Sequence, residues 1–211
     1  MTDIDFAFKK EEIEALAEII QKRRDVRGNR FLNTPISEEI ISAMLSAANS
    51  APSVGFSQPW EFVIVESIET REKIYKEFKK QNKKANRIFK DSTLYSSLKL
   101  EGILESYINI AVFYIKPKKA VLGQTAQKRV GEYSVVCAIQ NLWLTARAYG
   151  VGVGWVSILK PKKVKKILKV GSDRKLIGYL TVGYVTDFAD KPELLTLGWD
   201  RKKCIDEVVR R

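Results

Sequence analysis

One predicted helix, spanning residues 133–149, is apolar on nearly every side. A helix on the surface of a soluble protein carries one apolar stripe, whereas a helix that is apolar all round must be buried on most sides. A chain of 211 residues suits one ordinary core. We therefore expect a subunit interface to cover part of this helix, and we expect Cys137 within it to be a small core residue.

The rest of the chain is predicted to form one domain over residues 1–211, because no internal repeat or low-complexity linker divides it. Apolar residues recur at helical spacing in residues 11–24, in residues 38–48 after a cap at Ser37, and in residues 69–90. Apolar runs predict strands at residues 61–66, 108–115, 150–157 and 176–185. Residues 91–107 are interpreted as a lid or an interface segment, and a C-terminal tail covers about residues 190–211.

The rare residue types exclude several kinds of site. The chain has no histidine, which excludes His-based triads, His metal ligands and imidazole proton shuttles. Cys137 and Cys204 alone cannot build a zinc site, so we expect no metal. The first residues lack the apolar core of a signal peptide, and no run approaches the ~20 apolar residues of a membrane span. We therefore expect a cytoplasmic protein that does not enter a membrane.

The formal charge of +12 does not identify a partner by itself. It suits nucleic acid, but the lysines are spread over several helices rather than gathered in one basic stripe. A lysine-rich, thermophile-like surface explains the charge equally well. We expect no nucleic-acid partner, and the lysine-rich residues 70–90 are either a solvated face or a basic surface near the lid.

Three arginines end the first predicted helix. Arg23 and Arg27 are four residues apart and share one helix face, with Arg24 beside them. Guanidinium groups bind phosphate bidentately, so the cluster suits a phosphorylated ligand; the alternative is a solvated basic helix end. Asp25 either neutralises these arginines or points a carboxylate into a site that they define.

A short polar loop, residues 51–60, joins the second helix to the first strand. Ser53, Ser57 and Gln58 offer donors and acceptors, Gly55 permits close approach of a ligand, and Trp60 can anchor the loop. An ordinary turn with a packed tryptophan is the alternative. The glycine alternation at residues 150–154 is a different feature: it lacks the turn and helix of a Rossmann fingerprint, and the chain has no P-loop.

Five stretches follow one another along the chain: RRDVR at 23–27, APSVGFSQPW at 51–60, LKLEGI at 98–103, EYSVVCAIQNLW at 132–143 and GVGVGWVSIL at 150–159. Together they resemble the nitroreductase-like flavoprotein superfamily, over about residues 20–201. The arginine motif and P-S-x-x-x-x-Q-P-W mark the superfamily broadly. The aspartate in RRDVR, together with GWVS, resembles more specifically its 5,6-dimethylbenzimidazole synthase branch (BluB).

The resemblance implies an α+β fold with a central, mainly antiparallel sheet wrapped by helices, in an intertwined homodimer with two FMN sites at the interface. It implies that Arg23, Arg24 and Arg27 meet the phosphate and ribityl end of FMN, with Arg201 as a further phosphate contact. The other residues implied to contact the flavin are Ser53, Gly55 and Gln58 in the loop, Leu98 in the lid, and Trp155 and Ser157 along the isoalloxazine and ribityl groups. The glycine-alternating strand would pack against the flat ring system.

In this branch reduced FMN is the substrate as well as the cofactor. O₂ is the co-substrate, and the fragmentation of FMN yields the lower ligand of vitamin B12, with its C2 carbon drawn from the ribityl chain. By resemblance, Asp25 is the acid/base near the ribityl carbons, and Ser157 hydrogen-bonds to and orients either the ribityl chain or the peroxyflavin. Because arginines flank Asp25, we expect its carboxylate to be ionised at neutral pH, which favours a base role. A flavin reductase or NAD(P)H would supply the electrons.

Three alternatives stay open. The first is a nitroreductase or flavin reductase that keeps FMN bound and passes electrons from NAD(P)H to nitroaromatics or quinones; a serine at position 25 is more typical of that group. The second is a dehalogenase of the iodotyrosine type, whose loop resembles P-S-G-A-H-T-E-P-W, unlike the sequence of residues 54–58 here. The third is a basic nucleic-acid-binding domain, which rests on net charge alone.

Overall fold

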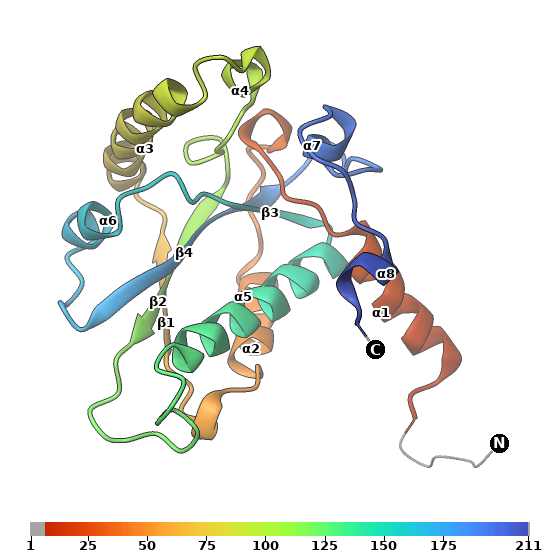
Figure 1. Cartoon of the computed structure of the whole chain (residues 1–211), viewed down its shortest axis with the longest axis vertical. Helices are drawn as coiled ribbons and strands as arrows, with labels where there is room; N and C mark the ends of the chain where they lie inside the picture. The colour runs from red at the N-terminus through yellow and green to blue at the C-terminus, as the bar shows by residue number, and fades with distance from the viewer. Residues whose placement is uncertain (1–6, 211) are drawn as a thin grey trace.

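A four-stranded sheet forms the middle layer of the computed structural model, which describes residues 7–210 (Figure 1). The strands are β1 (Trp60–Val65), β2 (Ile108–Ile115), β3 (Val151–Trp155) and β4 (Arg174–Tyr184), in the order β1-β2-β4-β3. Every neighbouring pair is antiparallel, which confirms the predicted sheet. The first six residues, in which we expect no leader, and Arg211 at the end of the tail lie outside the described residues.

The helices follow the predicted order. They are α1 (Lys10–Lys22), α2 (Glu38–Asn49), α3 (Ile68–Ile88), α4 (Thr93–Ser97), α5 (Val130–Ala148), α6 (Pro161–Leu168), α7 (Glu193–Thr196) and α8 (Ile205–Val208), with short 3-10 turns η1 (Gly28–Arg30) and η2 (Val54–Phe56). Ser37 caps α2 as predicted, because its hydroxyl accepts a hydrogen bond from the Ile40 amide at 3.4 Å. None of the helices among residues 7–210 is both long and apolar enough to cross a membrane.

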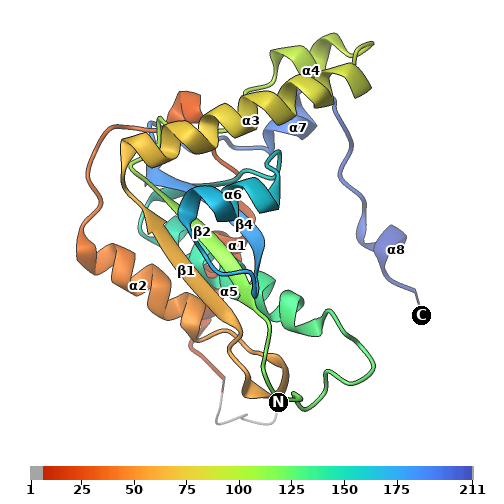
Figure 2. The same ribbon diagram turned by 90° about the vertical axis from the view of Figure 1, so that its left-hand side faces the viewer.

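Helices cover both faces of the sheet (Figure 2). One core lies between the sheet and α2 and α5, and a second lies between the sheet and α3 and α6. Strand β2 is buried along almost its whole length because it lies inside the sheet and contributes to both cores. This explains its continuous apolar run, since both of its faces must be apolar.

The lysine-rich helices α3 and α6 lie side by side on one face of the sheet (Figures 1 and 2). This differs from the scattered distribution expected from the sequence, because two helices about 80 residues apart in the chain pack against each other. Phe89, at the end of α3, stacks on Tyr95 of α4 with ring centres 4.6 Å apart. The basic segment therefore ends next to the predicted lid.

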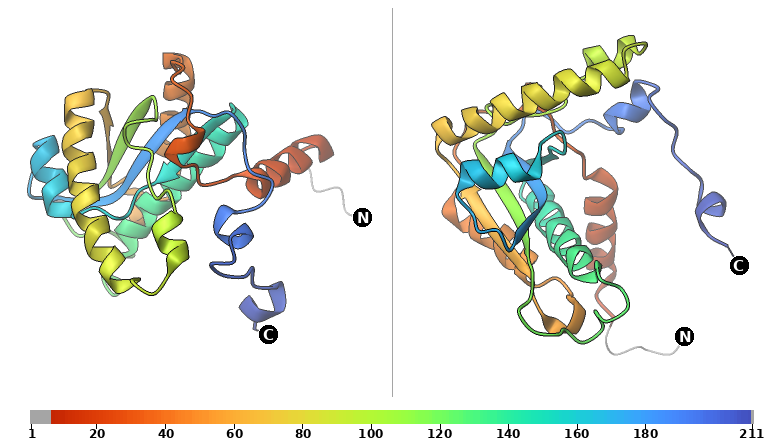
Figure 3. Two further views of the ribbon diagram at one scale, coloured as in Figure 1. Left: turned by 90° about the horizontal axis from the view of Figure 1, so that it is seen from above. Right: turned by 60° about the vertical axis from the view of Figure 1, so that its left-hand side comes forward.

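Three parts of the chain leave apolar side chains exposed. Helix α1 buries none of its residues, and Ile13, Leu16 and Ile20 are each about half exposed on one face. The C-terminal segment exposes Leu194, Leu197 and Val208, and only its last part, around α8, stands away from the body of the chain (Figure 3). Helix α5 likewise exposes Tyr133, Val136 and Cys137, so the prediction that Cys137 lies in the core is wrong.

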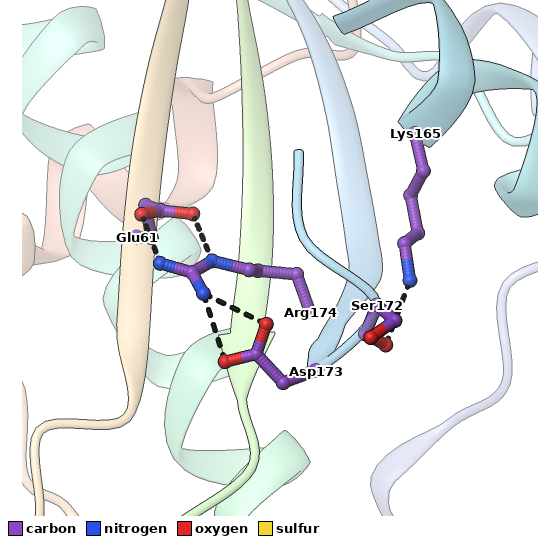
Figure 4. A network of polar contacts seen from close by, with 5 residues as sticks. All are labelled: Glu61, Lys165, Ser172, Asp173 and Arg174. Carbon is purple, nitrogen blue, oxygen red and sulfur yellow. Dashed lines mark hydrogen bonds and ion pairs between the residues drawn. The ribbon is translucent and has the colours of Figure 1, made fainter. Parts of the chain in front are cut away.

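A cluster of charged groups ties the two strands that flank β2 (Figure 4). Arg174 of β4 donates two hydrogen bonds to the Glu61 carboxylate of β1, at 2.9 and 3.1 Å. It also donates to both carboxylate oxygens of Asp173 at 2.8 Å. Lys165 of α6 donates to the Ser172 carbonyl at 3.0 Å, so this end of the sheet is joined to the helix that covers it.

The predicted lid, residues 91–107, divides into two parts. The buried Arg71 of α3 donates to the carbonyls of Ile103, Leu104 and Tyr107 at 2.8–2.9 Å, and also to that of Ser106. Residues 103–107 are therefore fixed to the body of the domain. In the first part, which includes α4, residues 98–100 line the cavity described next.

Candidate functional site

The segment that carries the arginines and Asp25 is attached to strand β3. The Val26 amide donates to the Val153 carbonyl at 3.0 Å, and the Trp155 amide donates to the Asp25 carboxylate at 3.0 Å. A side chain at Gly154 would overlap the Val26 carbonyl, and one at Gly152 would overlap Val185. The glycine alternation is therefore required by the close approach of the chain's own segments, which corrects the expectation that it serves a flat ring system.

Arg27 joins Asp25 to the lid. Its guanidinium forms an ion pair with the Asp25 carboxylate and a weak contact, 3.5 Å long, with the Leu100 carbonyl. Arg23 lies over the Trp143 ring of α5, with its guanidinium carbon 4.9 Å from the ring centre. Both guanidinium groups line the same cavity and keep donors available for an anionic group.

Arg24 has a different environment. Its guanidinium donates to the carbonyls of Gln21 and Arg23 at 2.6 and 2.7 Å, to that of Ala189 at 2.9 Å, and to that of Asp190. It holds the C-terminal segment against the end of α1. Its implied phosphate contact stays a prediction, and making it would require some of these four bonds to break.

A cavity of about 460 Å³ is enclosed by the end of α1, the segment with Asp25, the lid and the C-terminal segment. This volume is in the range of small-molecule sites, which is about 300–1,000 Å³. The charged side chains that line it are Arg23, Arg24, Asp25, Arg27, Arg30, Lys99, Asp187, Glu193 and Lys202. Cations exceed carboxylates, so the cavity suits an anion, and its carboxylates can accept hydrogen bonds from hydroxyl groups.

The carboxyl group of Asp25 is harder to ionise than its arginine neighbours predict. Burial in the cavity wall raises its pKa most, and the charge of Glu193 raises it further, whereas Arg27, the Trp155 amide and Arg23 lower it. The net direction is upward, even though the side chain keeps 34% of its surface exposed. This is opposite to the direction expected from the sequence, where only the arginines were visible.

A small group of charged side chains holds the lid in place beside the cavity. Lys99 donates to Glu105 at 2.6 Å and forms an ion pair with the buried Glu101 at the same distance. Burial lowers the pKa of Lys99, but the two carboxylates outweigh it and leave the pKa raised. The Gly28 amide donates to the Glu101 carbonyl at 2.8 Å, which joins the lid to the residues that follow Arg27.

The loop of residues 51–60 has strained backbone and internal support. Gly55, Phe56 and Gln58 all have positive φ, between 43° and 54°. The Gln58 amide donates to the Ser53 hydroxyl at 3.0 Å, and the buried Trp60 donates to Asn49 at 3.0 Å, which makes Trp60 the expected anchor. The Ser57 hydroxyl is buried without a hydrogen-bond partner among the described residues. Strain and an orphaned polar group together are typical of a binding loop.

Within this loop, the nearest neighbour of Gly55 is another part of the chain. A Cβ atom at this position would lie 2.7 Å from the Leu122 carbonyl oxygen and 2.8 Å from Val121. The space beside Gly55, where a ligand was expected to approach closely, is filled on this side by the connection between β2 and α5. Asn49, which holds Trp60, was not singled out from the sequence, because nothing local marks it as a partner.

The two groups of predicted ligand contacts lie at opposite ends of helix α5. The Val54 amide donates to Ser134 in the first turns of α5 at 3.1 Å, whereas the indole of Trp143 donates to the Arg24 carbonyl at 3.2 Å. Arg147, nearer still to the end of α5, donates to the Lys22 carbonyl at 3.1 Å. Nine to thirteen residues of helix correspond to roughly 14–20 Å, so the loop and the arginines of one chain do not share one cavity.

The remaining predicted residues are placed as follows. Leu98 lines the cavity. Trp155 is joined to the cavity wall through its backbone amide, which donates to Asp25. The centre of its ring lies 6.5 Å from that of Trp143. Ser157 is exposed just beyond β3 and is not part of the cavity wall. Arg201 is held by Glu207 outside the cavity, and Lys202 lines the wall instead.

Sequence reasoning did not single out Lys99, Glu101 or Glu193. The first two lie inside a quoted motif, so their charges were a signal that could have been used. For Glu193 the sequence held no such signal, because only the path of the C-terminal segment brings this residue to the cavity.

Comparisons with known proteins agree with this architecture. The model of the Nitroreductase family matches residues 20–184. A 5,6-dimethylbenzimidazole synthase from Rhodospirillum rubrum is 40% identical over 202 residues, which cover 94% of this chain and 94% of that protein.

Solved structures show the same fold. A BluB-like flavoprotein from Clostridium difficile 630 has a TM-score of 0.69 at 22% identity, covering 93% of this chain and 98% of the other. An iodotyrosine deiodinase bound to FMN and 3-iodo-L-tyrosine also has a TM-score of 0.69, at 24% identity, covering 92% and 97%. At these identities the likeness confirms the predicted α+β architecture.

Proposed function

The chain belongs to the nitroreductase family, and we propose that it is a 5,6-dimethylbenzimidazole synthase, which uses O₂ to fragment reduced FMN. The observation that carries the proposal is Asp25, a carboxyl group held by the Trp155 amide and Arg27 in the wall of a cationic cavity. The synthase from Rhodospirillum rubrum, similar along nearly the whole chain, supports the same reading.

The residues of the cavity fit the phosphate and polyol part of FMN. The guanidinium groups of Arg23 and Arg27 suit the phosphate, whereas carboxylates in the same wall suit ribityl hydroxyl groups, which are hydrogen-bond donors. Leu98 and the neighbouring lid residues cover the cavity and exclude water. At the other end of α5, the orphaned Ser57 hydroxyl and the positive-φ backbone of Gly55, Phe56 and Gln58 suit the edge of the flavin ring.

A homodimer brings these two half-sites together. In a two-fold arrangement with antiparallel α5 helices, the loop of residues 51–58 from one subunit lies beside the arginines of the other. Exposed apolar side chains of α5 and α1 provide the surface for such an interface, and Tyr133, Val136 and Leu16 are among them. A patch of this kind on two helices is typical of a subunit contact. This arrangement is supported because, within one chain, the loop and the arginines lie too far apart to form a complete FMN site.

Each residue then has a defined task. Reduced FMN, when bound, would supply the electrons for O₂ and the carbon atoms of the product, and because it is consumed, a flavin reductase or NAD(P)H would be needed to reduce each new FMN. Asp25 holds or accepts a proton near the ribityl carbons, and its raised pKa moves the pH range in which both of its protonation states are populated upward, toward neutral pH. The Trp155 amide fixes one carboxylate oxygen, and Arg27 fixes the other. Ser157 is exposed just beyond β3 and outside the cavity wall, so its proposed role in orienting the ribityl chain rests on the family resemblance.

The experiment that tests this function is direct. The purified protein is mixed with chemically reduced FMN in air, and the products are analysed by mass spectrometry for 5,6-dimethylbenzimidazole. We expect the product from the wild type, and a rate lower by about 10²- to 10⁴-fold in Asp25→Asn, because that is the usual contribution of a general acid or base. We expect a loss of product from Ser157→Gly as well.

Asp200→Asn is the matched control, because Asp200 is an exposed aspartate of the C-terminal segment that does not line the cavity. It should keep most of the activity. If wild-type protein returns only intact, reoxidised FMN, the synthase proposal is wrong. NAD(P)H-dependent reduction of nitroaromatics or quinones is then the function to assay.

A further inference from the structure

The C-terminal segment is held in place as one wall of the cavity. Arg24 donates to the carbonyls of Ala189 and Asp190, and Arg30 forms an ion pair with Asp187. The guanidinium of Arg147 lies 4.0 Å from the centre of the Phe188 ring. Several independent contacts therefore fix the path of the chain just before α7.

The same segment is fastened to the lid further along. The Trp199 ring packs edge-on against Phe89, with ring centres 5.6 Å apart, and lies 6.2 Å from Tyr95 of α4. Residues between these two attachments are confined to the mouth of the cavity. Aromatic contacts of this geometry contribute stability beyond the area that they bury.

Glu193 is the acidic residue that this arrangement carries into the cavity wall. It is half-buried, although its neighbours Pro192 and Leu194 are exposed. Among residues 7–210, no hydrogen bond or ion pair engages its carboxylate. A half-buried carboxylate without a partner is costly unless it interacts with something in the cavity, because burial disfavours its charge.

Asp25 is the titratable group that Glu193 faces. The charged groups around Asp25 come from every wall of the cavity: Arg23 and Arg24 at the end of α1, Arg27 and Arg30 beyond it, Lys99 in the lid, and Asp187, Glu193 and Lys202 in the C-terminal segment. Asp187 is paired with Arg30, whereas Arg24 keeps its charge and donates its hydrogen bonds to backbone carbonyls. Glu193 is thus the unneutralised negative charge opposed to Arg27 and Arg23.

We propose that Glu193 is a positioning residue for Asp25, and that its negative charge, brought to the cavity wall by the C-terminal segment, favours the protonated form of the Asp25 carboxyl group. Burial and Glu193 act in one direction on this group, and Arg27 and Arg23 act in the other. The consequence for catalysis rests on the proposed function, but the titration of Asp25 does not.

The test is a carboxyl ¹³C NMR titration of the full-length protein without flavin. The resonance that disappears in Asp25→Asn identifies Asp25. Removing the negative charge in Glu193→Gln makes Asp25 easier to ionise, so its titration moves to lower pH. At the wild-type midpoint, we expect the ratio of ionised to protonated Asp25 to rise by about threefold, the size typical of one partly screened like charge.

Two variants serve as controls. Glu193→Asp keeps the charge and should titrate close to the wild type. Glu207→Gln removes a carboxylate of the same segment that is paired with Arg201 outside the cavity, and it should leave Asp25 unchanged. If Asp25 titrates in Glu193→Gln as it does in the wild type, or if Glu193→Asp shifts it equally, the proposal is overturned.

The pH profile of product formation provides the second readout. The limb governed by Asp25 should move to lower pH in Glu193→Gln, whether Asp25 acts as base or as acid, because its pKa falls in both cases. A purely structural role would lower the rate equally at all pH values, which would overturn the proposal for catalysis. If no variant forms product, the proposed function fails, and the NMR titration still decides the role of Glu193.

Discussion

The two ends of helix α5 differ in what they lack. The arginine end has an enclosed cavity with charged walls, but its aromatic and loop contacts for a flavin ring are few. The loop end has strained backbone and an orphaned hydroxyl, yet residues 51–58 line none of the larger cavities of the described chain. Each end holds half of the proposed site. This difference is the reason for proposing that the functional unit is a homodimer rather than one chain.

The two ends are also built differently. At the arginine end, backbone bonds to β3 and charged groups from four segments fix the residues in place. At the loop end, a few side-chain bonds support residues in uncommon conformations. Changes at the first end should therefore affect folding and proton chemistry, whereas changes at the second should affect flavin affinity alone.

The largest effect is expected from separating the two halves. Val136 is 42% exposed on the uncovered side of α5. Glutamate at this position would bury charge in the proposed interface, so we expect Val136→Glu to be monomeric and to bind FMN about 100-fold more weakly. Light scattering after gel filtration and quenching of FMN fluorescence measure the two changes.

Ile88→Glu is the control for that variant, because Ile88 is 78% exposed at the end of α3, away from α5. It should remain dimeric and keep its affinity. A monomeric Val136→Glu that binds FMN normally would show that one chain holds the whole site, and the division into two halves would be abandoned.

An intermediate effect is expected where the arginine end meets the sheet. A methyl group in Gly154→Ala would overlap the Val26 carbonyl and push the Asp25 segment away from β3. Overpacking of this kind costs about 1–3 kcal/mol of unfolding free energy, which urea titration measures. In Gly150→Ala the new atom meets nothing within 4 Å, so only the left-handed backbone opposes it. Equal losses in both variants would contradict the tight junction with β3.

The smallest effect is expected at the loop. Ser53→Ala removes the acceptor of the Gln58 amide and loosens a residue with positive φ. One such hydrogen bond is worth about 1 kcal/mol, or about a fivefold loss of FMN affinity. Ser50→Ala, which removes a bond to the carbonyl of Ser46 at the end of α2, should leave affinity unchanged. The Asp25 titration should be the same in both, since Asp25 lies at the other end; a shift there would connect the two regions.

Much of the fold follows from local patterns. Strand β2 covers the predicted residues 108–115, Ser37 caps α2, and α5 begins and ends within a few residues of the prediction. These features depend on a short stretch of chain and on the period of its side chains, so they are visible without packing. The order of the quoted motifs likewise identified the family.

The roles of individual residues were harder to predict from the sequence. The glycines at 152 and 154 accommodate neighbouring segments of the chain, Arg24 binds backbone carbonyls, and the pKa of Asp25 is raised instead of lowered. Each depends on a partner far away in sequence; the Trp155 amide is 130 residues from Asp25. No window of the sequence contains both partners, so their distance is set by packing alone.

The sequence by itself therefore determined the elements, the family and the types of group that the site requires, because periodicity and motif order are properties of the chain. Only the tertiary structure decided that the arginines and the loop lie at opposite ends of α5, and that Glu193 and Asp25 line one cavity. The reason is physical: burial and the electric field at a carboxyl group depend on every segment that surrounds it, however distant along the chain.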